Sequence, residues 1–299
     1  MWNKPWRIKE GFVIGTGLIV TGLVLQFSVG PIDWSLFAWP ANIIVLSVFL
    51  LLSAIIYAFR SKAYGFRFLA TYMCAVPALV MTSALTIIMG LTAQVSENSQ
   101  PADFLGITKM LSFWPFVLLY LWIAFILAQV SLIQMLHFKW RRLPSLVSHI
   151  GLLITLLTAT LGSADMQRLQ MYTVLDQTEW RGIGERNVVT ELPIAITLKQ
   201  FIMETYDDGS PKRFASDIMV YTKNGESLRT VVDVNKPAEI NGWKIYQYGY
   251  DTSMGAESKL SILELVRDPW LPYVYAGIYL MIAGAVLLLF TAQRKKTKD

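Results

Sequence analysis

The sequence predicts a polytopic α-helical membrane protein with six transmembrane helices and one extracytoplasmic all-β, sandwich-like domain inserted between spans five and six. Three observations predict this fold class. The 299-residue chain is 54% hydrophobic and only 16% charged, whereas soluble domains carry about 25% charged residues. Residues 164–267 hold much of the charge, with 12 Lys/Arg and 15 Asp/Glu. The remaining cations gather beside long apolar runs, so the chain is divided between lipid and water.

Six apolar runs are long enough to cross a bilayer, because its hydrocarbon core of about 30 Å needs about 20 residues of helix. None of these runs contains Asp, Glu, Lys or Arg. Pro77 and Pro115 lie within runs, so we expect them to bend or begin their helices. The predicted spans cover residues 11–29, 41–59, 68–92, 113–136, 145–163 and 271–292.

These spans divide the chain into three parts. Residues 1–163 form a five-span membrane domain, residues 164–267 an extracytoplasmic β-rich domain, and residues 268–299 the sixth span with a basic cytoplasmic tail. The charged start resembles that of a secretory signal peptide, but the apolar run is long for one and no Ala-x-Ala site follows it. We therefore expect the first span to be uncleaved.

Positive charge alternates with every crossing and predicts the orientation. Four segments at alternate span ends carry 13 Lys and Arg, whereas the short opposing loops 30–40 and 93–112 carry only Lys109. Cytoplasmic loops are enriched in Lys and Arg. We therefore expect a multi-pass protein of a bacterial inner membrane, with both termini cytoplasmic and residues 164–267 outside. The 13 cations are Lys4, Arg7, Lys9, Arg60, Lys62, Arg67, Lys139, Arg141, Arg142, Arg294, Lys295, Lys296 and Lys298.

Period-two alternation predicts strands in residues 164–267. Ile194, Ile196 and Leu198 alternate with smaller or polar residues, and the segment 171–175 alternates in the same way. Turn pairs separate several of the strands, which is typical of an antiparallel sandwich or open barrel. No amphipathic helix of ten residues stands out there. Further strands are expected at 217–222, 228–234, 243–250 and 259–266, and turns at Asp208-Gly209, Asn224-Gly225 and Asn241-Gly242.

Composition excludes several classes of function. Cys74 is the single cysteine, so the chain has no internal disulfide, no Cys-x-x-Cys redox pair and no Cys-x-x-Cys-His motif of its own. The basic excess lies at the span ends, which argues for a lipid bilayer and against a nucleic-acid partner. The spans lack acidic and basic residues, which argues against a proton-coupled transporter. Residues 164–267 contain no histidine, which excludes a Ser-His-Asp set there.

His149 is the strongest candidate for a chemical role, because polar groups within a bilayer are costly and commonly functional. It lies about five residues inside the predicted fifth span, and a neutral imidazole is a common axial ligand of haem iron. Arg141 and Arg142, about 10–12 Å away along the helix axis, are placed to pair with haem propionates. The simpler interpretation is a hydrogen bond across helices for His149 and positive-inside charge for the arginines.

One histidine supplies one axial ligand. A second ligand would come from His137, at the inner end of the fourth span, or from a partner protein, and we favour the partner. Apart from haem iron bound through His149, the sequence predicts no metal site and no catalytic residue.

Several ordered stretches carry a resemblance to a known family. HIGLLITLLTATLGS (149–163) ends a span directly before the outer domain, and the later stretches follow in a fixed order. They are LPI (192–194), KQF (199–201), ETY (204–206), GSPKRFAS (209–216), VNKP (234–237), NGWKIYQ (241–247) and RDP (267–269), followed by Gly277 and Gly284 in the last span. This ordered set resembles the ResB/CcsB family of the System II cytochrome c biogenesis pathway over about residues 145–290.

The resemblance implies an accessory subunit of a holocytochrome c synthase (haem lyase) complex. The family works with a CcsA-type partner that bears a tryptophan-rich haem-handling loop and external histidines, and together they join haem to an apocytochrome c. In the family, a histidine in the span before the outer domain is thought to ligate haem within the membrane, and His149 matches it by position. The implied cofactor is haem b, held transiently and shared with the partner.

The sequence departs from the family pattern in two ways. Family members usually have three spans before the outer domain, whereas five are predicted here, and the extra pair has no function that we can derive. No Trp-x-x-Trp-x-x-Asp motif of the partner occurs in the chain. We therefore do not expect complete synthase activity from this chain alone.

Two other functions stay open. The chain is alternatively a structural or sensory membrane protein, whose outer β-domain binds a protein or an envelope ligand while the spans only anchor it. A transporter is the third interpretation, and it is the least supported because the spans carry no ionisable pathway.

Overall fold

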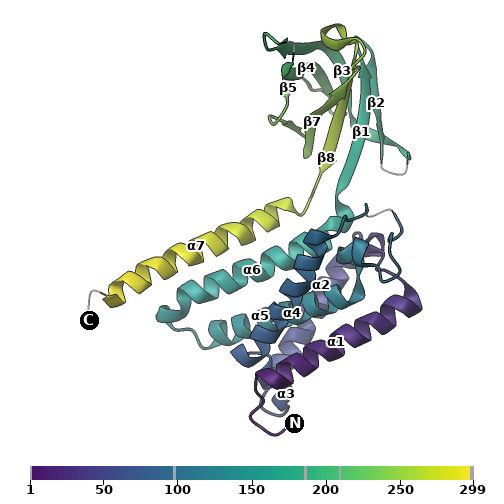
Figure 1. The fold of residues 1–299 in the computed structure, drawn as a ribbon. Coiled ribbons are helices and arrows are strands. Elements are labelled where there is room, and N and C mark those ends of the chain that lie inside the picture. Colours follow the sequence, from purple (N-terminus) through teal and green to yellow (C-terminus); the bar gives the residue numbers. More distant parts are fainter. Residues whose placement is uncertain (1, 97–98, 185–186, 209, 297–299) are drawn as a thin grey trace. The chain divides into compact units, whose positions relative to one another are not determined.

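A computed structural model describes residues 2–96, 99–184, 187–208 and 210–296 (Figure 1). The chain forms two compact units, one comprising Met1–Ala164 with Trp270–Asp299 and the other Asp165–Pro269. Lys298 of the predicted tail and Gly209 of the predicted Asp208-Gly209 turn lie outside the described residues.

Long apolar helices make up the first unit. Within the described residues, six helices are long and apolar enough to cross a membrane, as the hydropathy pattern predicts for a multi-pass membrane protein. They are α1 (Ile8–Val29), α2 (Ala41–Ala58), α4 (Tyr72–Leu91), α5 (Trp114–Leu136), α6 (Leu143–Gly162) and α7 (Leu271–Lys296). The short helical segments are α3 (Tyr64–Phe68), η1 (Trp34–Phe37), η2 (Ile107–Ser112), η3 (Trp140–Arg142) and η4 (Ser163–Asp165).

The predicted span 68–92 begins later than expected, because a separate short helix precedes it. Helix α3 ends at Phe68, and Thr71 then takes an extended conformation before α4 begins at Tyr72. The Thr71 hydroxyl donates a 2.6 Å hydrogen bond back to the Phe68 carbonyl oxygen, which closes the turn between the two helices. Pro115 lies in the first turn of α5, as predicted, whereas Pro77 lies inside α4.

Helix α5 is the centre of the helical unit. It packs against α1, α2, α4 and α6. About half of the residues in its most apolar 18-residue stretch are buried, a far larger share than in any other candidate span described. Its Trp122, Leu119 and Ile126 join the α1 and α4 side chains in one hydrophobic cluster. Its Ala124 and Ala128 pack with α2 and α6 in another.

Helices α6 and α7 run side by side (Figure 1), and glycines bring their backbones close together. A Cβ atom added to Gly151 would lie 2.7 Å from both the carbonyl oxygen of Gly277 and the backbone nitrogen of Met281. A Cβ on Gly284 would likewise meet the backbone of Ser148 at 2.7 Å. Small residues allow this close approach of backbones between membrane helices. We call this contact the glycine seam.

The second unit is one antiparallel sheet of eight strands in the described residues, in the order β5-β4-β3-β2-β1-β8-β7-β6. Strand β5 also contacts β6 and β7, so the two ends of the sheet approach each other and the sheet curls around its core. The strands are β1 (Gln167–Val174), β2 (Thr178–Ile183), β3 (Val189–Thr205), β4 (Pro211–Thr222), β5 (Ser227–Asp233), β6 (Ala238–Ile240), β7 (Trp243–Tyr250) and β8 (Leu260–Arg267).

The curled sheet differs in detail from the predicted domain. An antiparallel β-domain is confirmed, but a sandwich of two sheets is not, because the strands form one continuous sheet. Strands β2 and β6 were not predicted. The sequence of β2, TEWRGI, lacks apolar alternation, and its position depends on pairing with β1 and β3. Strand β6 has only three residues, and the Asn241-Gly242 turn joins it to β7, with φ of 50° and 77° at the two turn residues.

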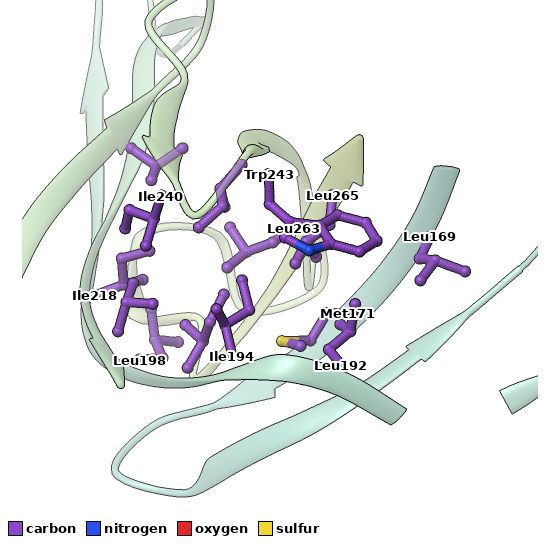
Figure 2. Close-up of a cluster of buried hydrophobic side chains, with 14 residues drawn as sticks. Leu169, Met171, Leu192, Ile194, Leu198, Ile218, Ile240, Trp243, Leu263 and Leu265 are labelled. Atoms are coloured by element: carbon purple, nitrogen blue, oxygen red, sulfur yellow. The ribbon is translucent and has the colours of Figure 1, made fainter. Parts of the chain in front are cut away.

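Alternating side chains of the strands fill the interior of this unit (Figure 2). Met171, Ile194, Ile218 and Leu263 are each 1% exposed or less. Trp243 at the start of β7 is also buried beside Leu265. The described part of the unit contains only one short 3₁₀ helix, η5 (Gly255–Glu257), in agreement with the absence of a predicted amphipathic helix.

Candidate functional site

His149 lies in the second turn of α6, and its side chain is half-buried. The helix begins just before it, with Pro144 in the first turn, where the missing N–H of proline costs no hydrogen bond. The imidazole therefore lies near one end of the helical unit, at a fixed position on a regular helix.

The face of α6 that carries His149 points toward α5. Ser145, His149, Leu153, Leu156 and Thr160 recur at helical spacing and so share one face. Contacts to α5 continue along this face beyond the histidine: Leu153 packs against α5 in a shared cluster, and the Leu156 carbonyl accepts a 2.9 Å hydrogen bond from Tyr120 of α5. The ring consequently lies on the protein side of α6, and the opposite face forms the glycine seam.

A chain of polar contacts ends on the imidazole. The Nδ1 atom of His149 lies 3.2 Å from the Ser145 hydroxyl oxygen. That oxygen accepts a 3.3 Å hydrogen bond from the side-chain amide of Gln134 in α5. Within the described part of the chain, Nε2 of His149 has no hydrogen-bond partner, so one ring nitrogen is engaged and the other is available. We call Gln134, Ser145 and His149 the imidazole relay.

Two buried polar atoms near the relay lack partners. The amide oxygen of Gln134 and the hydroxyl oxygen of Ser131 are both buried with no hydrogen bond to any described residue. Ser131 is 3% exposed and lies one helical turn before Gln134, on the same side of α5. Buried polar groups are nearly always hydrogen-bonded, and exceptions call for an explanation. Both atoms belong to α5 and lie within one helical turn of each other.

Apolar side chains continue the interface beyond the histidine. Phe49 of α2 and Ala124 and Ala128 of α5 pack against Leu153 and Leu157 of α6. Because alanine side chains are small, the surface of α5 protrudes little beside these leucines. The arrangement is polar near the start of α6 and apolar deeper along it, as the sequence pattern predicts.

Arg141 and Arg142 are both exposed, in the turn that precedes α6. Arg142 comes seven residues before His149, which places it on the same helical face about 10 Å away along the axis. Arg141 precedes it in the short 3₁₀ helix η3. In the described residues neither guanidinium forms an ion pair with a carboxylate.

His137 caps the C-terminal end of α5 and is exposed. No contact joins it to the relay in the described part of the molecule. The structure therefore does not bring the two histidines together on one site.

The described residues contain no group of three or more His, Cys, Asp and Glu side chains that could hold a bare metal ion. A lone imidazole therefore fits an iron whose other ligands arrive with it, as the four nitrogens of a porphyrin do. The donor set fits haem in this respect: one available ring nitrogen, an apolar wall of leucines, and cations near one end.

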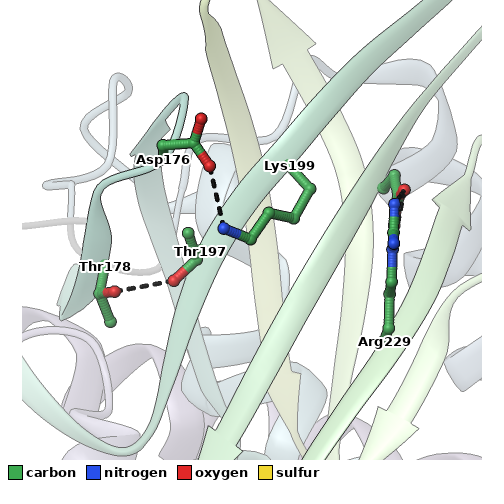
Figure 3. A network of polar contacts seen from close by, with 6 residues as sticks. Asp176, Thr178, Thr197, Lys199 and Arg229 are labelled. Atoms are coloured by element: carbon green, nitrogen blue, oxygen red, sulfur yellow. Dashed lines mark hydrogen bonds and ion pairs between the residues drawn. The ribbon is translucent and has the colours of Figure 1, made fainter.

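The β-domain contains polar clusters with a structural role. Ser216, Gln247 and Ser261 are hydrogen-bonded to one another in the interior, at 2.6–3.0 Å for the three closest pairs. Figure 3 shows further contacts between neighbouring strands, including the 2.9 Å ion pair of Lys199 with Asp176 and the 2.8 Å contact of Thr178 with Thr197. These contacts satisfy polar groups of the strands and of the turn that carries Asp176.

Sequence reasoning missed Gln134 and Ser131. Both residues are neutral, so neither stands out in a span as a histidine or a charged side chain does. A signal was present, because Gln129, Ser131 and Gln134 interrupt an otherwise apolar run. Gln129 serves helix packing, since its amide donates a 2.9 Å hydrogen bond to the Ser53 carbonyl of α2.

Comparison with known proteins identifies relatives of the segment that contains His149. Residues 139–263 match the model of the ResB-like family. A "Cytochrome c biogenesis protein CcsB" from Prochlorococcus marinus subsp. pastoris is 31% identical over 133 residues, which are 43% of this chain and 30% of that protein. A solved structure titled "Cytochrome c Heme Lyase CcmF" aligns with 91% of this chain and 49% of its own length. Its 16% identity and TM-score of 0.35 are too low to carry an argument.

The aligned part therefore spans less than a third of the CcsB relative and about half of the CcmF chain. The family match begins at residue 139 and so includes Arg141, Arg142, Ser145 and His149. Gln134 and the earlier helices lie before it.

Proposed function

Residues 139–263 are of the ResB/CcsB family, and on that premise we propose that the chain is a membrane subunit of a cytochrome c maturation complex that binds haem through His149. The observation that carries this proposal is the available Nε2 of a half-buried imidazole whose other nitrogen is already engaged by Ser145. In the proposed complex, haem b is held transiently and shared with a CcsA-type partner subunit.

The residues of this chain have distinct tasks in the proposed mechanism. When bound, haem would supply the iron chemistry, and His149 would hold it through Nε2. The leucines of α6 provide an apolar surface for the macrocycle. Arg141 and Arg142 precede the start of α6 and would pair with the haem propionates. In this proposal a second ligand to the iron would come from the partner subunit.

The proposed orientation gives the β-domain its role. With both termini cytoplasmic, residues 164–267 lie outside the inner membrane, where c-type cytochromes receive haem. Among the described residues, β6 pairs with Trp243–Ile245 of β7, and Tyr248 further along β7 is 56% exposed. The edge of β7 near Tyr248 is the proposed docking point. An extended apocytochrome segment would pair with this edge by strand addition. Crosslinking from position 248 tests this docking, and its absence across the whole domain would contradict it.

A spectroscopic experiment tests the haem assignment. The native complex is purified with its co-purifying subunits, and its haem is measured by the Soret band and the pyridine haemochrome. We expect His149→Gly to lose or shift the Soret band and added imidazole to restore it. His137→Gly is the matched control and should leave the spectrum unchanged, because His137 is exposed at the end of α5. An unchanged spectrum in His149→Gly would contradict the assignment of His149 as a haem ligand.

The competing function makes an opposite prediction. A purely structural or sensory membrane protein would co-purify without haem, and its deletion would leave cytochrome c levels normal. Measuring covalently bound haem in a deletion strain separates the two functions, because loss of assembled cytochrome c is expected only for a maturation subunit. We do not expect synthase activity from this chain without its partner.

A further inference from the structure

We infer that Gln134 and Ser145 set which nitrogen of His149 is offered to iron, and that the imidazole relay reverses its hydrogen-bond direction when iron binds. This inference rests on the proposed haem function and adds two positioning residues to it. Gln134 lies outside the family match, so the geometry alone assigns it.

The hydroxyl of Ser145 stands between the other two side chains. Its oxygen is 3.2 Å from Nδ1 of His149 and 3.3 Å from the amide nitrogen of Gln134. Ser145 and His149 are one turn apart on α6, whereas Gln134 belongs to α5. The relay therefore ties the ring to a neighbouring helix as well as to its own, which restricts rotation of the imidazole.

The Ser145–His149 contact allows two directions, because either the serine hydroxyl or the ring is its donor. In the first direction the Gln134 amide N–H donates to the Ser145 oxygen, and the Ser145 O–H donates to Nδ1. A neutral imidazole that accepts at Nδ1 carries its hydrogen on Nε2. In this direction the ring presents an N–H, and no lone pair, at the nitrogen that has no protein partner.

Iron requires the opposite tautomer. The neutral ring binds iron through the lone pair of Nε2, and its hydrogen then lies on Nδ1. One proton leaves Nε2 and one arrives at Nδ1 by exchange with water, so the ring remains neutral. Nδ1–H now donates to the Ser145 oxygen, and the serine hydrogen turns toward Gln134.

The unpartnered atoms make this reversal possible. The amide oxygen of Gln134 is buried without a hydrogen bond to any residue that the structure describes, and rotation of the amide by about 180° presents it to the Ser145 hydroxyl. The hydroxyl oxygen of Ser131 in α5 also lacks a described partner. Ser131 is three residues before Gln134 and so is a neighbour on the helix surface.

The hydrogen-bond direction of the iron-bound state strengthens the bond between His149 and iron. A carbonyl acceptor at the end of the relay pulls on the Nδ1 hydrogen and raises the basicity of the imidazole, and loss of such an outer partner typically costs about 10–100-fold in metal affinity. A more basic axial ligand favours ferric over ferrous iron. The midpoint potential of the bound haem should therefore rise when the relay is cut.

Four variants of the purified complex test the relay: Ser145→Ala, Gln134→Leu, Ser145→Thr and the control Ser148→Ala. Ser148 is on the same helix, but its hydroxyl donates to the Pro144 carbonyl, so it is outside the relay. The two readouts are the rate of haem transfer to apomyoglobin and the midpoint potential from a redox titration. We expect Ser145→Ala and Gln134→Leu to release haem about 10–100-fold faster and to shift the potential upward, whereas Ser145→Thr and Ser148→Ala resemble the wild type.

The outcomes separate the relay from the function on which it rests. If His149→Gly loses haem but Ser145→Ala matches Ser148→Ala in both readouts, the relay is wrong and the haem site stands. If His149→Gly keeps wild-type haem, the proposed function fails and the relay with it. If Ser145→Thr behaves like Ser145→Ala, the hydroxyl is not the operative group and the relay is also overturned.

Discussion

Gly151 of α6 and Gly277 of α7 meet so closely that a Cβ atom on Gly151 would lie 2.7 Å from the Gly277 carbonyl oxygen. The backbones of the two helices are therefore in direct contact at this level. Thr155 lies one turn further along α6, and its backbone nitrogen would be 2.8 Å from a Cβ on Gly277. The glycine seam fixes one face of α6 and leaves the opposite face to α5 and the imidazole relay.

Gly151→Ala is expected to destabilise the helical unit by about 1–3 kcal/mol, because the added methyl group overpacks a backbone contact. Gly90→Ala is the matched control, since a Cβ at Gly90 in α4 meets no atom within 4 Å. Alanine is the better helix former, so the control should be neutral or stabilising. Thermal unfolding of the purified protein in detergent measures both, and equal midpoints would contradict the seam.

Trp243→Ala is expected to destabilise the β-domain by about 3–5 kcal/mol, the usual cost of removing a buried aromatic side chain. Trp243 is 2% exposed, whereas Trp180 on β2 is 46% exposed. Trp180→Ala should therefore cost only about 0.5 kcal/mol. Hydrogen exchange of strand amides in the full-length protein reports both values. Similar protection in the two variants would show that Trp243 is not a core residue.

Asp103 anchors the loop between α4 and α5 through hydrogen bonds. We therefore expect the stability of this loop to depend on pH. Burial acts to raise the pKa of its carboxyl, but hydrogen bonds from the Thr108 hydroxyl and from the backbone N–H groups of Thr108, Ile107 and Gly106 outweigh burial and hold this pKa well below its usual range. A lowered pKa stabilises the folded loop above the unfolded value of about 3.9, and this stabilisation is lost as the pH falls through the folded pKa.

Exchange protection of the amides of residues 106–108 should therefore be constant from pH 8 to pH 5, after correction for the intrinsic rate, and should fall below about pH 4. Asp103→Asn should lose much of this protection already at pH 7, because a neutral amide is a weaker acceptor than a carboxylate. Wild-type protection in Asp103→Asn at pH 7 would refute the role of the carboxylate.

Single-cysteine labelling tests the predicted orientation. Cys74 is buried, and Cys74→Ala gives a background without cysteine. Asn224→Cys in the β4–β5 turn should react with a membrane-impermeant maleimide in cells whose outer membrane is permeabilised, whereas Ser61→Cys should react only after lysis. Both positions are exposed, so accessibility within the fold does not separate them. The reverse pattern would overturn the sidedness and the mechanism that depends on it.

Most of the helical unit could be predicted from the sequence, because long uncharged apolar runs have few alternatives to a membrane helix. The five-residue α3 could not, since one helical turn leaves no periodic signal. In the β-domain, β3 and β7 follow their alternating patterns. Strand β2 carries Glu179, Trp180 and Arg181 with no alternation, and pairing with its neighbours decides its conformation.

The candidate site was predicted only in part. His149 is conspicuous as an imidazole within an apolar run, and its position on a helix follows from the sequence. Its contact with Ser145 also follows from their spacing of four residues. The contribution of Gln134 could not be predicted, because it depends on the alignment of α5 against α6, and a single sequence does not encode that alignment in a readable pattern.

The glycine seam also has a consequence for how the chain is made. Helix α6 ends at Gly162 and α7 begins at Leu271, so about 110 residues are synthesised between the two halves of the seam. At about 5–20 residues per second, the ribosome needs roughly 5–20 s to deliver the second half. During that interval the glycine-containing face of α6 is in the bilayer and α7 has not yet been made. A membrane chaperone or another subunit therefore has access to this face of α6 before α7 covers it.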